Sequence, residues 1–150
     1  MATHALREQL SSSVLHLRKR RNMPASALAI AAGISRNTLY LIEKRAANTQ
    51  VETIERLAIA LDVDPYDFFD VSAAPSVRRR RNVSLCQCVS QNVFRYRKQL
   101  GLSQEGLVRA ASLPRGYIWR VERTAPDMSL EVVDRIAAAL KVQASLLFKE

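Results

Sequence analysis

The sequence repeats itself at an offset of 79 residues, and this repeat constrains the fold more than any single motif does. Residues 14–69 align with residues 93–148 without a gap, and many apolar positions keep their character in both copies. The identical pairs include Leu28/Leu107, Ala32/Ala111, Glu52/Glu131, Leu61/Leu140 and Phe69/Phe148. The chain therefore reads as two copies of one module of about 65 residues, each near the lower size limit for folding alone.

A short segment without periodicity separates the two copies. Residues 71–77 read Val-Ser-Ala-Ala-Pro-Ser-Val, and a run of four arginines follows directly. Small residues, serine and proline in such a stretch are typical of a linker. We therefore expect a first domain over residues 1–70, a linker with the arginine run over 71–82, and a second domain over 83–150.

Basic residues outnumber acidic residues unevenly along the chain. The formal net charge is +9, and residues 77–150 carry 14 basic and 6 acidic residues, against 9 and 8 in residues 1–76. Within the first half, the bases gather in residues 7–45 and the acids in residues 46–76. This pattern favours one basic working face that meets a polyanion and an acidic back, although a charge balance tuned for solubility is an alternative.

Apolar residues recur at helical spacing and no segment alternates with a period of two, so we predict an all-α fold. In the first copy, Gly33 is placed to end the second helix in a left-handed conformation, and Ser35 is placed to cap the third. The helices expected there cover about residues 5–21, 24–32, 36–45, 51–61 and 65–69.

The second copy is expected to repeat this order of helices. Its first helix ends at Leu100, and the next three begin at about Ser103, Arg115 and Leu130. A last short turn covers residues 145–148. In each copy, two short helices joined by a tight turn, the second of them basic and exposed, form a helix-turn-helix.

With this arrangement, each copy resembles the phage-repressor, Cro-type (XRE-like) helix-turn-helix family. The matching segments are LRKRRNMPASALAIAAGISRNTLYLIEKRAANTQVETIERLAIALDVDPYDFF and YRKQLGLSQEGLVRAASLPRGYIWRVERTAPDMSLEVVDRIAAALKVQASLLF. The resemblance implies two tandem five-helix lambda-repressor-like domains joined by a short basic linker, and it implies that each domain binds double-stranded DNA.

The outward face of each third helix carries side chains suited to a major groove. On a projection of 100° per residue, Asn37 and Lys44 point away from the buried side in the first copy. Arg120 and Arg123 do so in the second, together with Gly116. Asn pairs with adenine, Arg pairs with guanine, and apolar groups meet the thymine methyl. By position in the family motif, we expect the base-reading residues to be Arg36, Asn37, Leu41, Arg115 and Arg120; the alternative is an ordinary solvated helix face.

Other residues are expected to contact the DNA backbone and to set the register. These are Lys44, Arg45, Asn48, Gln104, Arg123, Arg78, Arg79, Arg80 and Arg81. For the arginine run, a solvated linker, a minor-groove arm and a phosphate clamp all remain open.

Two Arg/Glu pairs recur at the same spacing of 25 residues, Arg18 with Glu43 and Arg97 with Glu122. The family resemblance implies that each is a partly buried salt bridge between the first and third helices of its domain. We therefore count these four residues as structural and not as DNA contacts.

Each copy departs from the family pattern in its own way. The first has Ala25 where the family carries a glutamine at the start of the second helix. The second has Ser112 in place of the turn glycine, Pro114 in place of the cap, and Gly116 within the expected third helix, where it would cost about 1 kcal/mol. These departures put the turn geometry of the second copy in doubt.

Catalytic, metal and membrane chemistry finds little support in the sequence. Cys86 and Cys88 stand two apart, where helical residues do not share a face, and only His4 and His16 accompany them. We expect no cofactor, no metal and no enzymatic activity. No apolar run approaches a membrane span, and the segment MATHALREQL has no signal-peptide core, so we expect no membrane partner and a bacterial cytoplasmic protein, nucleoid-associated when bound.

The leading hypothesis is a bacterial or phage-type transcription regulator, a repressor that occludes a promoter, with two modules reading two half-sites from one chain. A homodimer that presents four modules is an alternative. A second hypothesis is an antitoxin or anti-activator that holds a protein partner through the same scaffold. The apolar ends, Phe68-Phe69 and Leu146-Leu147-Phe148, would then be docking surfaces, whereas otherwise they close the core.

Overall fold

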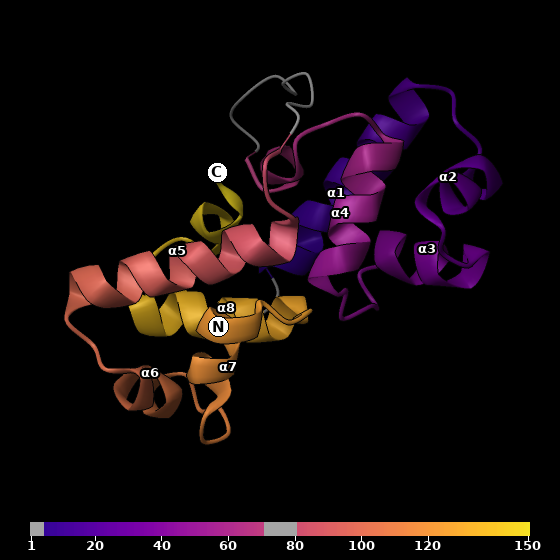
Figure 1. Cartoon of the computed structure of the whole chain (residues 1–150). Coiled ribbons are helices and arrows are strands. Elements are labelled where there is room, and N and C mark those ends of the chain that lie inside the picture. Colours follow the sequence, from indigo (N-terminus) through magenta and orange to yellow (C-terminus); the bar gives the residue numbers. More distant parts are fainter. Residues whose placement is uncertain (1–4, 71–80) are drawn as a thin grey trace.

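The computed structural model describes residues 5–70 and 81–150 and confirms the all-α prediction (Figure 1). No strand occurs in these residues beyond one isolated β-bridge. The first domain contains α1 (Ala5–Arg20), α2 (Ala25–Ala32), α3 (Arg36–Glu43), α4 (Val51–Ala60) and the 3-10 helix η1 (Pro65–Phe68). The second contains α5 (Leu85–Leu100), α6 (Gln104–Ala110), α7 (Tyr117–Thr124), α8 (Leu130–Leu140) and the 3-10 helix η2 (Ala144–Phe148).

In the first domain, the expected turn between α2 and α3 is confirmed. Gly33 ends α2 with φ of 65°, a left-handed conformation that a glycine adopts without steric cost. The Ser35 side chain then accepts a hydrogen bond from the backbone N–H of Thr38 and so caps α3. Pro24 is the residue before α2 and not the first residue inside it. The helix α3 ends at Glu43, two residues earlier than expected, because Arg45 adopts a left-handed φ of 61°.

In the second domain, the segment between α6 and α7 has the same left-handed conformation near its start, here in a serine in place of the glycine. Ser112 adopts a φ of 53° at the position equivalent to Gly33. A residue with a Cβ tolerates this conformation at a cost of about 1 kcal/mol. Ser112 therefore takes the left-handed conformation that Gly33 takes in the first domain, and it does not disrupt the turn at this position.

The start of α7 differs from the expected one. The helix begins at Tyr117 and not at Arg115, because Gly116 takes a left-handed φ of 76° and stands just before the helix. The N–H of Tyr117 bonds to the carbonyl of Pro114 in the preceding turn. Gly116 is thus outside the helix, and the expected propensity cost within the helix was wrong.

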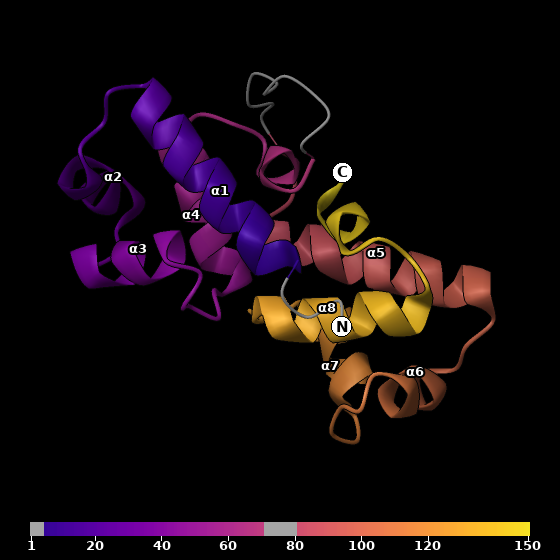
Figure 2. The same cartoon turned by 180° about the vertical axis from the view of Figure 1, so that it is seen from behind.

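The two domains pack closely on each other and share one continuous core of buried side chains. The helix α4 contacts α5, α1 contacts α8, and η1 contacts η2 (Figures 1 and 2). At the centre, Gln50 and Ser129 form the isolated antiparallel bridge, and the rings of Phe69 and Phe148 stack with centroids 4.7 Å apart. These contacts make a domain interface that the linker composition did not predict.

No single helix within residues 5–70 and 81–150 is long and apolar enough to cross a membrane. Taken together, α2 and α3 are long and apolar enough to cross a membrane by length and composition only, but a bend of 111° separates the two helices.

Candidate nucleic-acid interface

The surface of α3 combines a basic residue at its start with an amide and an aromatic ring. Leu39 and Ile42 are buried and anchor the helix, which leaves the opposite face to solvent. Arg36 and Asn37 are exposed on the first turn, and Leu41 is half-buried beside them. This face offers a guanidinium and an amide for base edges and an apolar group for a thymine methyl.

The surface of α7 is more basic. Ile118 and Val121 anchor this helix in the core, while Arg120 and Arg123 are exposed on the opposite side. The Arg120 guanidinium lies 4.9 Å from the centroid of the Tyr117 ring, which holds part of the side chain against the helix. Arg115 is also exposed, but it precedes the helix in the turn, so its expected place on the recognition helix was wrong.

Sequence reasoning left one pair of residues out of the candidate site. Tyr40 and Trp119 occupy equivalent positions of the repeat, and their exposed fractions are 57% and 55%. Lys44 adds to this surface, because its Nζ lies 5.8 Å from the centroid of the Tyr40 ring. The signal in the sequence was an aromatic residue repeated at a position that the helical projection leaves outside the core.

Each third helix is tied to the first helix of its own domain by an Arg–Glu pair. Arg18 Nε lies 2.6 Å from Glu43 Oε1, and Arg97 Nε lies 2.6 Å from Glu122 Oε1. A second contact from each Nη2 makes both pairs bidentate, at 3.1 and 3.0 Å. Each arginine also donates to a backbone carbonyl just after its helix, that of Met23 or Leu102. These bonds fix the tilt of α3 and α7 and keep the four charges away from the exposed faces.

Gln104 has a partner inside the second domain. Its Nε2 donates to Glu122 Oε2 at 2.7 Å, so it extends the Arg97–Glu122 pair. The first domain has Ala25 at the equivalent position and lacks this bond. The side chain is half-buried, and a contact to the DNA backbone stays a prediction.

Two further backbone candidates, Arg45 and Asn48, lie after α3 in different surroundings. Arg45 is exposed and approaches Glu8 at 3.8 Å. Asn48 belongs to the domain interface: its Oδ1 accepts the backbone N–H of Glu131 at 3.2 Å, and its Nδ2 donates to the Glu131 carboxylate at 3.4 Å. The structure therefore gives Asn48 an interdomain role that local sequence did not indicate.

Arg81 is not a free basic arm, which corrects the expectation for this end of the linker. Its side chain is only 8% exposed, and its Nη2 donates to Asp64 Oδ1 at 2.7 Å and to the Phe148 carbonyl at 3.1 Å. These bonds join the first domain to the end of the second. Arg78, Arg79 and Arg80 lie outside the described residues.

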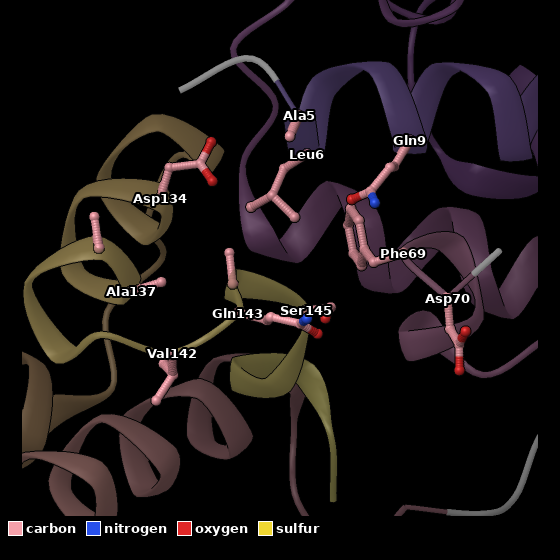
Figure 3. A pocket seen from close by; sticks show the side chains of 12 residues that line it. Ala5, Leu6, Gln9, Phe69, Asp70, Asp134, Ala137, Val142, Gln143 and Ser145 are labelled. Atoms are coloured by element: carbon pink, nitrogen blue, oxygen red, sulfur yellow. The ribbon is translucent and has the colours of Figure 1, made fainter. Parts of the chain in front are cut away.

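A cavity of about 460 Å³ opens at the domain interface between α1 and α8 (Figure 3). Leu6, Phe69 and Ala137 line it, and Asp134 lies on its α8 wall. Asp134 is 4% exposed, and its Oδ2 has no hydrogen-bond partner. Burial raises the pKa of this carboxyl from 3.8 to about 6, although the charge of Arg7 opposes the shift.

The two cysteines are buried, and burial raises the pKa of Cys86 to about 12 and that of Cys88 above its usual value. Burial thus favours the protonated form of both thiols. Within residues 5–70 and 81–150, no three His, Cys, Asp or Glu side chains gather as metal ligands would.

The helices α3 and α7 lie toward one side of the molecule (Figures 1 and 2). In both views α3 runs along the lower edge of the first domain and α7 lies at the lower edge of the second, whereas the C-terminus lies above both (Figures 1 and 2). A family model described as the Cro/C1-type helix-turn-helix DNA-binding domain matches residues 14–74, and one described as a helix-turn-helix domain matches residues 94–147. The chain is a tandem pair of helix-turn-helix domains.

Both matches contain a complete helix-turn-helix, α2 with α3 in one domain and α6 with α7 in the other. No curated protein and no solved structure matches the chain. The two family matches are therefore the comparison that indicates DNA binding for this tandem helix-turn-helix protein.

Proposed function

We propose that this tandem helix-turn-helix protein is a sequence-specific regulator of transcription that binds duplex DNA and represses by covering a promoter. One observation carries the proposal. The two domains expose, at equivalent positions of their third helices, an aromatic ring beside basic side chains. The opposite side of each helix is buried, through Leu39 and Ile42 in α3 and through Ile118 and Val121 in α7. An ordinary solvated helix face has no reason to expose Tyr40 and Trp119 in the same place twice.

The candidate residues divide into two roles. Asn37 on the first turn of α3, the half-buried Leu41 and the exposed Arg120 of α7 read base edges. Lys44 and Arg123, one turn further along, contact phosphates and set the register. Arg36 and Arg115 stand at the leading ends, where a recognition helix enters the groove first.

The burial of the apolar ends supports core closure over docking of a protein partner. Phe68, Phe69, Leu147 and Phe148 are at most 3% exposed, and Leu146 is half-buried. We therefore rank direct repression above action through a protein partner.

Titration of the purified full chain with fluorescent duplexes, in a series of salt concentrations, tests the proposal. Asn37→Ala and Arg120→Ala should each weaken binding to a preferred duplex by about 1–3 kcal/mol and relax base preference. Lys44→Ala and Arg123→Ala should weaken binding to all duplexes evenly and reduce the slope of log affinity against log salt by about 1.

The matched control is Lys149→Ala, which removes one exposed charge at the C-terminal end, away from α3 and α7. Its slope should equal that of the unaltered chain. If Lys149→Ala changes the slope as much as Arg123→Ala does, the assigned face is wrong. If no duplex binds at low salt, the proposed function is wrong.

A further inference from the structure

The contacts at the domain interface join equivalent residues of the repeat. The N–H of Val51 bonds to the carbonyl of Met128 at 2.8 Å, and the N–H of Leu130 bonds to the carbonyl of Thr49 at 2.9 Å. The repeat offset carries Val51 onto Leu130 and Thr49 onto Met128. Each hydrogen bond is thus the symmetry mate of the other.

Further contacts across the interface also join equivalent positions. Gln50 bridges its own equivalent, Ser129, and Phe69 stacks on its own equivalent, Phe148. The contact of α4 with α5 is mirrored by that of α8 with α1. A surface that meets its own copy in this way is isologous, and only a two-fold axis produces it. The chain therefore contains, within itself, the arrangement of a two-fold dimer.

This arrangement is rigidly packed. The Phe69 and Phe148 rings are 3% and 0% exposed and belong to the core that both domains share. Polar bonds also hold the two domains together, from Asn48 to Glu131 and from Arg81 to Asp64 and the Phe148 carbonyl. Domains joined by a large apolar interface do not move freely on their linker. The relative position of α3 and α7 is thus set by packing.

Duplex DNA has local two-fold axes, and a two-fold pair of recognition helices meets two inverted half-sites at one spacing. In a homodimer the two helices are identical, so the site is a palindrome. Here the two helices differ at the positions that face outward. The equivalent pairs are Asn37/Gly116, Leu41/Arg120, Tyr40/Trp119 and Lys44/Arg123.

We propose that one chain reads one oriented, non-palindromic DNA site whose two inverted half-sites differ in composition. This inference rests on the proposed function and names its substrate. The half-site under α3 prefers A·T pairs, because Asn37 pairs with adenine and Leu41 meets a thymine methyl. The half-site under α7 requires guanine, because Arg120 presents the side chain that pairs with guanine. A second copy is not needed, since the isologous surface is already covered within the chain.

Selection of duplexes from a random library by the purified full chain tests this inference. The expected result is one dominant motif with two unlike inverted halves at one fixed spacing, bound by one chain per duplex. Asn37→Ala should erase preference only in the A·T half, and Arg120→Ala only in the guanine half.

Changes in the DNA keep the test independent of protein folding. Insertion of five base pairs between the halves turns one half to the opposite side of the duplex and should weaken binding at least tenfold; insertion of ten should weaken it as much, because the packed domains cannot separate. A palindromic motif, two chains per site, a single half-site, or tolerance of either insertion would overturn the inference while leaving DNA binding in place. Failure to enrich any duplex would overturn the proposed function itself.

Discussion

The two domains build the same turn and the same recognition-helix frame with different local signals. The first uses a turn glycine, Gly33, and a serine cap, whereas the second uses Ser112 in a left-handed conformation and Gly116 just before the helix. The second adds Gln104 to its buried ion pair, where the first has Ala25. What both keep is the set of buried apolar positions and the bidentate Arg–Glu pair. Core packing and that pair therefore define the fold, and the turn residues can change around them.

The largest expected effect is a loss of stability on breaking either Arg–Glu pair, and the loss should be greater in the second domain. The Arg97 and Glu122 side chains are 6% and 8% exposed, against 15% and 13% for Arg18 and Glu43. Arg97→Met should lower the free energy of unfolding by about 4 kcal/mol and Arg18→Met by about 3, because each leaves a buried carboxylate without its partner. Urea unfolding of the full chain measures both. The double variant Arg97→Met/Glu122→Leu should recover part of the loss, and a larger loss for Arg18→Met would contradict the ranking.

The second expected effect distinguishes Arg81 from the basic residues of the DNA face. Arg81→Gln should lower the free energy of unfolding by about 2 kcal/mol, since Asp64 and the Phe148 carbonyl lose a charged donor. It should leave the salt dependence of DNA binding unchanged. Arg123→Gln is the matched control and should do the reverse, with stability within about 0.5 kcal/mol. An unaltered stability for Arg81→Gln would show that this contact does not join the domains in solution.

A pH-dependent difference is expected between the equivalent carboxylates Asp134 and Glu55. Glu55 Oε1 accepts the N–H of Leu85, the first residue of α5, at 3.0 Å, whereas Asp134 is buried with Oδ2 unpartnered. The folded chain keeps the Asp134 proton up to a pKa of about 6, and the unfolded chain releases it near 4, so its contribution to stability falls as pH rises between these values.

Asp134→Asn should therefore gain about 1–2 kcal/mol in free energy of unfolding relative to the unaltered chain on going from pH 4 to pH 7.5. Thermal or urea unfolding at the two pH values measures the difference. Glu55→Gln should show no such gain, because it loses a charged acceptor. If the stability difference between Asp134→Asn and the unaltered chain were the same at both pH values, the pKa of Asp134 would not be raised by burial.

The smallest expected effect concerns the turn. Ser112→Gly should stabilise the chain by about 0.5–1 kcal/mol, because the left-handed conformation strains a residue with a Cβ. Gly33→Ser should destabilise it by a similar amount, since no atom lies within 4 Å of a Cβ built there and only the φ of 65° opposes it. If Ser112→Gly and Gly33→Ser changed the free energy of unfolding by the same amount and in the same direction, the two turns would not be equivalent.

Sequence reasoning recovered what repeated apolar spacing and local capping encode. The helices, the left-handed Gly33 and the Ser35 cap follow from residues close in the chain. It missed the start of α7 because Pro114 and Gly116 together form a turn that the unbroken repeat concealed. It did not predict the interdomain bonds of Arg81 and Asn48, because their partners are distant in the sequence and a basic linker gives no local signal of burial. The two-fold interface was likewise invisible, since no single residue encodes it.

A hydroxyl-radical footprint of the full chain on its selected duplex tests most directly whether two packed domains place α3 and α7 on one duplex. We predict two protected blocks on the same face of the DNA, with one bound chain, and with Asn37→Ala and Arg120→Ala each affecting a different block. A single protected block, or two blocks that require two chains, would contradict it.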